Sequence, residues 1–286
     1  MRAMVWGTVL AAAVVGLAHA QDTLEDASET AQPTIEDLAL EPLGSGGVGQ
    51  IEAEPRDADA FVAANLEWLL LHALATTLTE TLGYDAPNAD GADAFASSRL
   101  SARHDEATAA VRLVAVAEAM ALAAEGDAPA YFEANDLDRA RAFRVLCVAN
   151  GADNAQARAA LRFADAPKDE FDACRVDRDL ATEEWDVALS ADYAFPGDPP
   201  ADVTASYGEA GPNDEDAAFI RETSLLEMLA EETAETYALF EPVTIEARSC
   251  DGGEGLIAEA GSLVLCYGVV RDLRALVEPV SGKADQ

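Results

Sequence analysis

The sequence predicts a mainly helical protein of the α+β class, with one small β element near the C-terminus. Apolar residues recur with a helical period over most of the chain between residues 57 and 239. Runs with strand character occur only at residues 243–247 and 262–266. The four cysteines are an even number, which favours two disulfides in an exported chain. A chain of 286 residues can bury a substantial core.

Residues 1–20 have the pattern of a secretory signal peptide. Arg2 supplies the positive charge, residues 5–17 form a short apolar run, and Ala18-His19-Ala20 gives a small-x-small cleavage site. The apolar run is too short to span a bilayer. We therefore expect a secreted or periplasmic protein with no membrane insertion after cleavage.

Residues 21–56 are rich in acidic residues, Thr, Pro and Gly, which predicts a disordered tether. A helical domain is expected over residues 57–190. Its first helix starts at Asp57, and Gly83 occupies the position of a C-terminal cap. Its core face has a period of 3.6 residues and consists of Leu66, Leu69, Leu70, Leu74 and Leu78.

The helical pattern continues along the domain. Residues 92–124 form an Ala-rich helical region with a break near His104-Asp105. A third helix is expected over residues 136–150, and further helices over 154–163 and 168–189. Residues 191–212 are rich in Pro and Gly and are expected to form a connection. Residues 213–286 should pack on the same domain, with a helix at 214–239 and a short closing helix at 269–276.

The two strand-like runs predict a hairpin-like element, because glycine-rich residues 251–255 separate them. Three disulfide pairings are possible among Cys147, Cys174, Cys250 and Cys266. The nearest-neighbour pairing joins Cys147 to Cys174 and Cys250 to Cys266, and it keeps each bond within one segment. The second bond would pin the ends of the β element. A four-cysteine zinc site is not indicated, because the chain has no C-x-x-C pair.

The net charge of −36 makes nucleic acid and anionic lipid poor partners. A solvated acidic coat explains this charge without a specific ligand. No loop has the ligand spacing of an EF-hand, so calcium binding is not indicated.

The helix at residues 61–82 contains a single histidine, His72. Zinc peptidases of the zincin type carry His-Glu-x-x-His on such a helix, because residues i and i+4 share one face. The five positions read here His72, Ala73, Leu74, Ala75 and Thr76. One ligand position is kept, while the general base and the second ligand are absent. The chain also lacks a G-x-S-x-G motif and a P-loop.

Several separated stretches over residues 58–275 resemble the bacterial secreted metallopeptidase-like family that is catalogued as domain of unknown function 4344. The segment His72–Thr76 stands where that family has His-Glu-Leu-Gly-His. Residues 88–93 resemble its acidic segment and keep Asp90 and Asp93. The remaining matches are Asp138, Arg141, Cys147, Cys174, Trp185, Cys250 and Cys266.

This resemblance implies a zincin-like helical domain whose zinc site has degenerated. The vestigial metal positions are His72, Ala73, Thr76 and Asp90, so no catalytic residue and no cofactor is expected. The four cysteines, with Asp138 and Arg141, would hold the fold. At a spacing of i, i+3, Asp138 and Arg141 could form an ordinary helix ion pair worth a few tenths of a kcal/mol. His72 is then a lone imidazole that donates to a carboxylate or a backbone carbonyl.

The function expected from this pattern is that of an inactive, metallopeptidase-like binding or accessory protein with a peptide or protein partner. One alternative is an active zinc metallopeptidase with non-standard ligands. Besides His72 and His104, it would need a carboxylate such as Asp90, Asp93 or Glu80. A second alternative is an acidic structural protein of the cell envelope.

Overall fold

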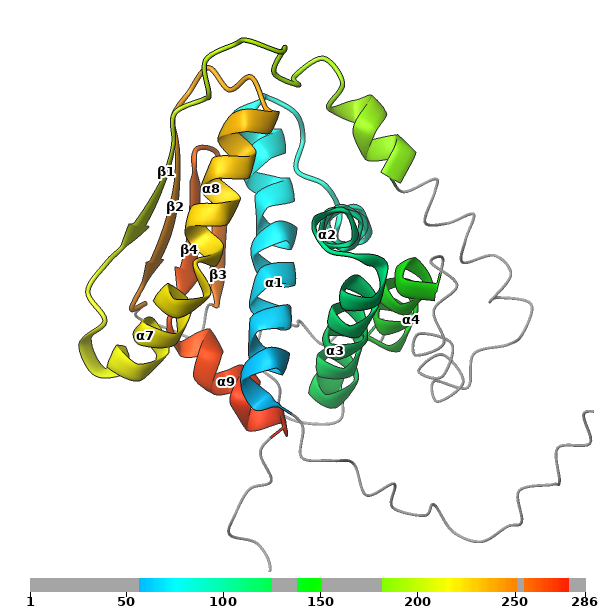
Figure 1. Cartoon of the computed structure of the whole chain (residues 1–286), viewed down its shortest axis with the longest axis vertical. Coiled ribbons are helices and arrows are strands. Elements are labelled where there is room, and N and C mark those ends of the chain that lie inside the picture. Colours follow the sequence, from blue (N-terminus) through cyan, green and yellow to red (C-terminus); the bar gives the residue numbers. More distant parts are fainter. Residues whose placement is uncertain (1–56, 125–137, 151–181, 251–254, 278–286) are drawn as a thin grey trace, which may run out of the picture. The chain divides into compact units, whose positions relative to one another are not determined.

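The computed structural model describes residues 57–124, 138–150, 182–250 and 255–277, all of which belong to one compact unit, Ala53–Gln286 (Figure 1). The expected signal peptide, the expected tether and Cys174 lie outside the described residues. The helices are α1 (Ala58–Thr81), α2 (Ala89–Arg103), α3 (Glu106–Ala124), α4 (Asp138–Asn150), α7 (Asp214–Thr223), α8 (Leu225–Thr236) and α9 (Gly268–Val277), with a short 3-10 turn at Gly211–Asn213. The strands are β1 (Val203–Tyr207), β2 (Val243–Arg248), β3 (Leu256–Glu259) and β4 (Ser262–Cys266).

Helix α1 begins and ends where the sequence predicts. The side chain of Asp57 accepts from the backbone N–H groups of Asp59 and Ala60 at 3.1 and 3.2 Å, and so caps the first turn. At the other end, Gly83 adopts a φ of +82°, which a residue with a side chain would adopt only with strain. The N–H of Tyr84 then reaches the carbonyl of Thr79 at 2.8 Å, which closes the helix in a Schellman motif.

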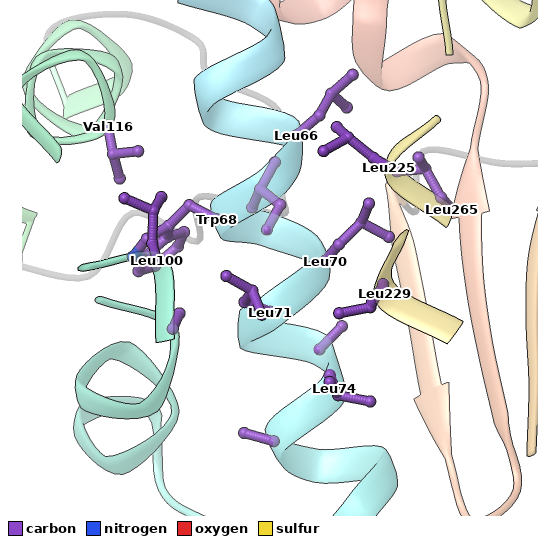
Figure 2. Close-up of a cluster of buried hydrophobic side chains, with 14 of the residues drawn as sticks. Leu66, Trp68, Leu70, Leu71, Leu74, Leu100, Val116, Leu225, Leu229 and Leu265 are labelled. Atoms are coloured by element: carbon purple, nitrogen blue, oxygen red, sulfur yellow. The ribbon is translucent and has the colours of Figure 1, made fainter. Parts of the chain in front are cut away.

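The core is built around α1, which is buried on most of its circumference (Figure 2). Leu66, Leu70 and Leu74 face α8 and the sheet, where they lie near Leu225, Leu229 and Leu265. Trp68 and Leu71 face the opposite way, toward Leu100 of α2 and Val116 of α3. Among the described helices, α1 alone is long and apolar enough to cross a membrane, but it is mostly buried inside the protein, as a core helix is.

The break predicted near His104-Asp105 is confirmed. Helix α2 ends at Arg103 and α3 begins at Glu106. Asp105 caps α3 by accepting from the N–H groups of Ala107 and Thr108, both at 3.1 Å. The closing helix and the helix that ends at Asn150 are also confirmed. Residues 182–188 are helical, which agrees with the end of the helix predicted over 168–189.

The sheet is larger than the predicted hairpin-like element, and its topology differs. Its four strands have the order β1-β2-β4-β3. The prediction that residues 243–247 and 262–266 form a hairpin is wrong, because β2 and β4 are parallel neighbours. The antiparallel partner of β4 is β3, and Gly261 at φ +71° makes the two-residue turn between them. The predicted connection at 191–212 contains β1, which pairs in parallel with β2.

The single helix predicted at 214–239 is two helices. Ser224 has a φ of +53°, so the chain leaves the helical path there and α8 starts at the next residue. Helices α7 and α8 together form the crossover that joins the parallel strands β1 and β2. Because Val243, Ile245 and Ala247 are buried and the residues between them are more exposed, one face of the sheet is packed on the core.

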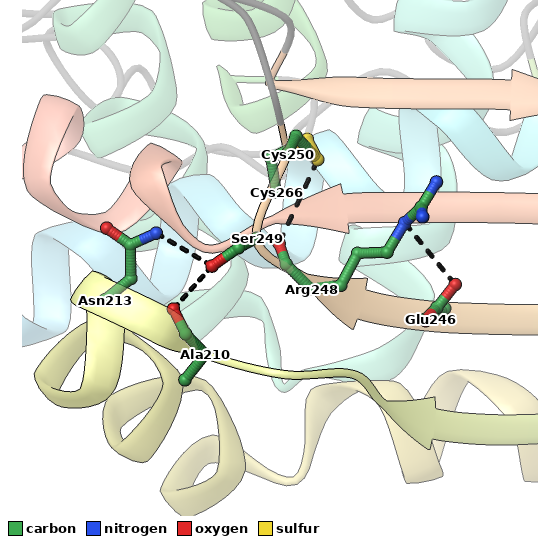
Figure 3. Close-up of a disulfide and its surroundings, with 7 residues drawn as sticks. All are labelled: Ala210, Asn213, Glu246, Arg248, Ser249, Cys250 and Cys266. Atoms are coloured by element: carbon green, nitrogen blue, oxygen red, sulfur yellow. Dashed lines mark hydrogen bonds and ion pairs between the residues drawn. A yellow bond between two sulfur atoms is a disulfide. The ribbon is translucent and has the colours of Figure 1, made fainter.

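The predicted disulfide between Cys250 and Cys266 is present (Figure 3). It links the chain just after β2 to the last residue of the parallel neighbour β4. Next to it, the hydroxyl of Ser249 donates to the carbonyl of Ala210 and accepts from the amide of Asn213 (Figure 3). Cys147 is also disulfide-bonded. These bonds are compatible with an oxidising extracellular or periplasmic compartment.

Replacing both Cys250 and Cys266 by Ala should destabilise the protein by about 2–5 kcal/mol, because the bond closes a loop between residues 16 positions apart. Urea unfolding of the variant and the unreduced wild type would measure this loss. An unchanged unfolding midpoint, or four free thiols in unfolded and unreduced wild-type protein, would show that the bond is absent in solution.

Candidate functional site

The side chain of His72 lies beside a carboxylate, and the residue that supplies it is Asp93 of α2. The distance from Nε2 of His72 to Oδ1 of Asp93 is 3.2 Å. Nε2 of His72 is buried and makes no hydrogen bond, so its contact with Asp93 is one of proximity. The imidazole of His72 also packs against the ring of Trp68, with ring centroids 5.2 Å apart. Trp68 is itself fixed, because its Nε1 donates to Oγ of Ser97 at 3.1 Å.

Arg141 of α4 completes this cluster, which we call the Asp93 cluster (His72, Asp93 and Arg141). Its Nε donates to Oδ2 of Asp93 and one terminal nitrogen donates to Oδ1, both at 2.8 Å. Both carboxylate oxygens are therefore held in a bidentate, charge-assisted pair. The side chain of Asp93 is 3% exposed and that of His72 is 27% exposed. The Asp93 cluster thus brings α1, α2 and α4 together around one buried carboxylate.

The environment of Asp93 favours its charged form. Burial raises the pKa of the Asp93 carboxyl, but the two hydrogen bonds and the charge of Arg141, together with the nearby ring of His72, lower this pKa by more. The net pKa lies below the ordinary value for aspartate, so Asp93 is a carboxylate at neutral pH. Its negative charge is balanced by the guanidinium of Arg141.

The residues present do not fit a catalytic zinc ion. Such an ion needs three protein ligands and an open position for water. Near His72 the structure offers Asp93, whose two oxygens already accept from Arg141. Ala73 is buried in the position of the general base and has no group that can take a proton. In the described parts of the chain, no three His, Cys, Asp or Glu side chains are grouped so that they could hold a metal.

The other predicted site residues lie apart from His72. Asp90, predicted as a vestigial metal position, is exposed and pairs with Arg144 at 2.5 Å. His104 faces Glu67 of α1, so the two histidines have different carboxylate partners. The side chain of Asp138 is outside what the structure describes, so its ion pair with Arg141 stays a prediction.

Trp185 supports the same helix that carries Asp93. Its Nε1 donates to the carbonyl of Gly91 at 2.9 Å. Its ring packs edge-on against Phe95, with centroids 4.9 Å apart. The first turns of α2 are therefore held by Trp185 and by Arg141, two of the residues that carried the family resemblance.

A second buried carboxylate, Glu67, was not predicted. Its side chain is 2% exposed, and Nε2 of His104 lies 3.0 Å from each of its oxygens. Arg112 donates to it at 2.7 Å and Arg103 at 3.4 Å, while Arg103 also pairs with Glu232 of α8. One signal was available in the sequence: a glutamate inside an apolar helix is seldom buried without cationic partners.

A pocket of about 650 Å³ lies next to α2, but it does not include the Asp93 cluster. Hydroxyl, carboxylate and aliphatic side chains line it, among them Ser101, Asp186 and Val187. Its described lining contains no cation and no histidine. The hydroxyls of Ser101 and Ser190 in this lining donate to backbone carbonyls and not to a carboxylate that could act as a base.

Replacing Asp93 by Ala should destabilise the protein by about 3–5 kcal/mol at neutral pH, because the change removes a buried carboxylate and both of its charge-assisted hydrogen bonds to Arg141. Asp90→Ala is the matched control on the same helix, and it should cost less than about 1 kcal/mol because its ion pair is exposed. Equal losses of unfolding free energy in the two variants would contradict the role given to Asp93.

The effect of Asp93 should also depend on pH. A carboxyl whose pKa is lower in the folded than in the unfolded state stabilises the fold above its unfolded pKa of about 3.9. This stabilisation is lost as the pH falls through the folded pKa. The stability difference between wild type and Asp93→Ala should therefore be constant near neutrality and shrink below about pH 4 in urea unfolding curves. A difference that stays constant down to strongly acidic pH would contradict the lowered pKa.

No family model, no curated protein and no solved structure matches this chain. The family resemblance in the sequence therefore gains no support from these comparisons.

Proposed function

We propose that this chain is an exported, metallopeptidase-like binding or accessory protein that has no catalytic activity. The observation that carries the proposal is the pairing of Asp93 with Arg141 beside His72. In this interpretation the cluster is a structural tie between α1, α2 and α4, placed where the resemblance to zinc peptidases would put a metal.

The guanidinium of Arg141 supplies the positive charge that a metal would otherwise bring to the site. To bind through Asp93, a metal ion would have to break two charge-assisted hydrogen bonds of 2.8 Å. It would gain only one imidazole and one carboxylate in return, one ligand short of a catalytic zinc site. Without a base at position 73, a bound water would also lack a group to take its proton.

Export is supported by the disulfide between Cys250 and Cys266, which an oxidising compartment would preserve. The expected signal peptide at residues 1–20 points to the same compartment. The charge of −36 and the lack of a metal-holding group of His, Cys, Asp or Glu among the described residues support a binding role.

An active zinc enzyme is the second candidate, and one observation favours it. Zinc-bound histidines usually have a carboxylate neighbour that orients the ring. The contact between His72 and Asp93 resembles such a pair. The two candidates differ in what His72 does: it is a zinc ligand in the enzyme and a packed side chain in the binding protein.

The zinc content of the purified protein distinguishes the two candidates. The wild type, His72→Ala and the control His104→Ala would be incubated with excess Zn²⁺, dialysed and analysed for metal. We expect well below one zinc per chain in all three proteins and no cleavage of unfolded casein. One zinc per wild-type chain that is lost in His72→Ala and kept in His104→Ala would refute the proposed function and support the enzyme.

A further inference from the structure

Three loops lie together at one end of the described unit, and we call them the loop end (residues 82–88, 189–202 and 237–242; Figure 1). The N–H of Ala194 donates to the carbonyl of Thr236 at 2.9 Å, and the N–H of Ala238 donates to that of Asp192 at 2.7 Å. The hydroxyl of Tyr84 reaches the carboxylate of Asp192 at 2.8 Å. These bonds give the three loops fixed positions relative to one another.

The loop end exposes aromatic side chains to an unusual degree. Phe240 is 97% exposed, Phe195 is 74% exposed and Tyr84 is 45% exposed. No other Phe, Tyr or Trp in the described part of the chain is among its exposed large apolar residues. The three side chains come from the three loops that these hydrogen bonds join. Exposed apolar side chains on neighbouring loops are a feature of interaction sites. Both phenylalanines stand within two residues of a proline, which limits the freedom of their loops.

The charges around these aromatic residues all have one sign. The three loops contain no Lys, Arg or His. Their acidic residues are Asp85, Asp192, Asp198, Asp202 and Glu241. Arg99 of α2 contacts the loop end by donating to the hydroxyl of Tyr193, and it also pairs with Asp186.

We propose that the loop end is the docking surface for a basic polypeptide, in which Lys or Arg side chains alternate with aliphatic ones. Phe195, Phe240 and Tyr84 would contact the aliphatic side chains, and the surrounding carboxylates would pair with the cations. This inference rests on the proposed role as a binding protein and adds the surface and the class of partner.

The charge of the loop end argues against other occupants. Nucleic acid and anionic lipid are repelled by a surface that carries only carboxylates. A second copy would bring the same carboxylates against each other, which costs free energy in a two-fold interface. The chain's own residues 21–56 are acidic and would be repelled in the same way.

The test uses a synthetic amphipathic peptide of Lys and Leu as probe, with a Glu–Leu peptide and a Lys–Ser peptide as matched probes. The proteins are the wild type, Phe195→Ser/Phe240→Ser and a control that removes exposed apolar side chains elsewhere, Val111→Ser/Met228→Ser. Fluorescence anisotropy of labelled peptide measures binding. We expect the Lys–Leu peptide to bind the phenylalanine variant at least about tenfold more weakly than the wild type and the control. The Lys–Ser peptide should bind the wild type weakly, and the Glu–Leu peptide should not bind.

Absence of binding between wild type and the Lys–Leu peptide would overturn the proposal, as would equal affinity in the phenylalanine variant. Self-association of the wild type that the phenylalanine variant abolishes in sedimentation would assign the surface to a second copy instead. Binding to vesicles of neutral lipid that requires both phenylalanines would assign it to a membrane. If the double variant unfolds, Phe240→Ser alone serves, since that side chain is almost fully exposed. None of these outcomes depends on zinc, so the docking proposal can fail while the non-catalytic role stands.

Discussion

The bidentate pair between Asp93 and Arg141 is the interaction on which the interpretation of this protein depends. A buried carboxylate needs a cationic partner, and either a metal ion or a side chain can provide it. Here the side chain of Arg141, from a helix that is distant in sequence, takes that place. His72 remains next to the carboxylate but adds only a close contact. This arrangement is consistent with the non-catalytic role proposed above.

Helix α1 is apolar on nearly all sides, so apolar packing alone would fix its rotation and register poorly. Two of its polar side chains contact residues of other helices. Glu67 contacts Arg103 of α2, Arg112 of α3 and His104 between those helices, while His72 lies beside Asp93 of α2. Buried ion pairs add little net stability, but a wrong register would leave their charges unpaired. We infer that these contacts select one arrangement of the helices around α1.

Much of the helical part could be predicted, because caps and breaks act locally. Asp57, Gly83 and Asp105 set their helix ends through hydrogen bonds or backbone angles of a few neighbouring residues. The sheet was mispredicted because strand pairing is non-local. The short strand β3, of four residues, lies between β2 and β4 in the sequence but at the edge of the sheet, so β2 pairs directly with β4. For the site, the sequence drew attention to His72, and the structure places that residue beside Asp93. Spacing could not show that Arg141 contacts Asp93, 48 residues away, since that contact depends on how the helices pack.

The most direct test is a crystal structure of the protein grown with Zn²⁺, with diffraction data collected at the zinc absorption edge. The account predicts no anomalous peak at His72 and both hydrogen bonds between Arg141 and Asp93 intact. A zinc ion bound to Nε2 of His72 and to Asp93, with Arg141 turned away and a water in the open position, would contradict it.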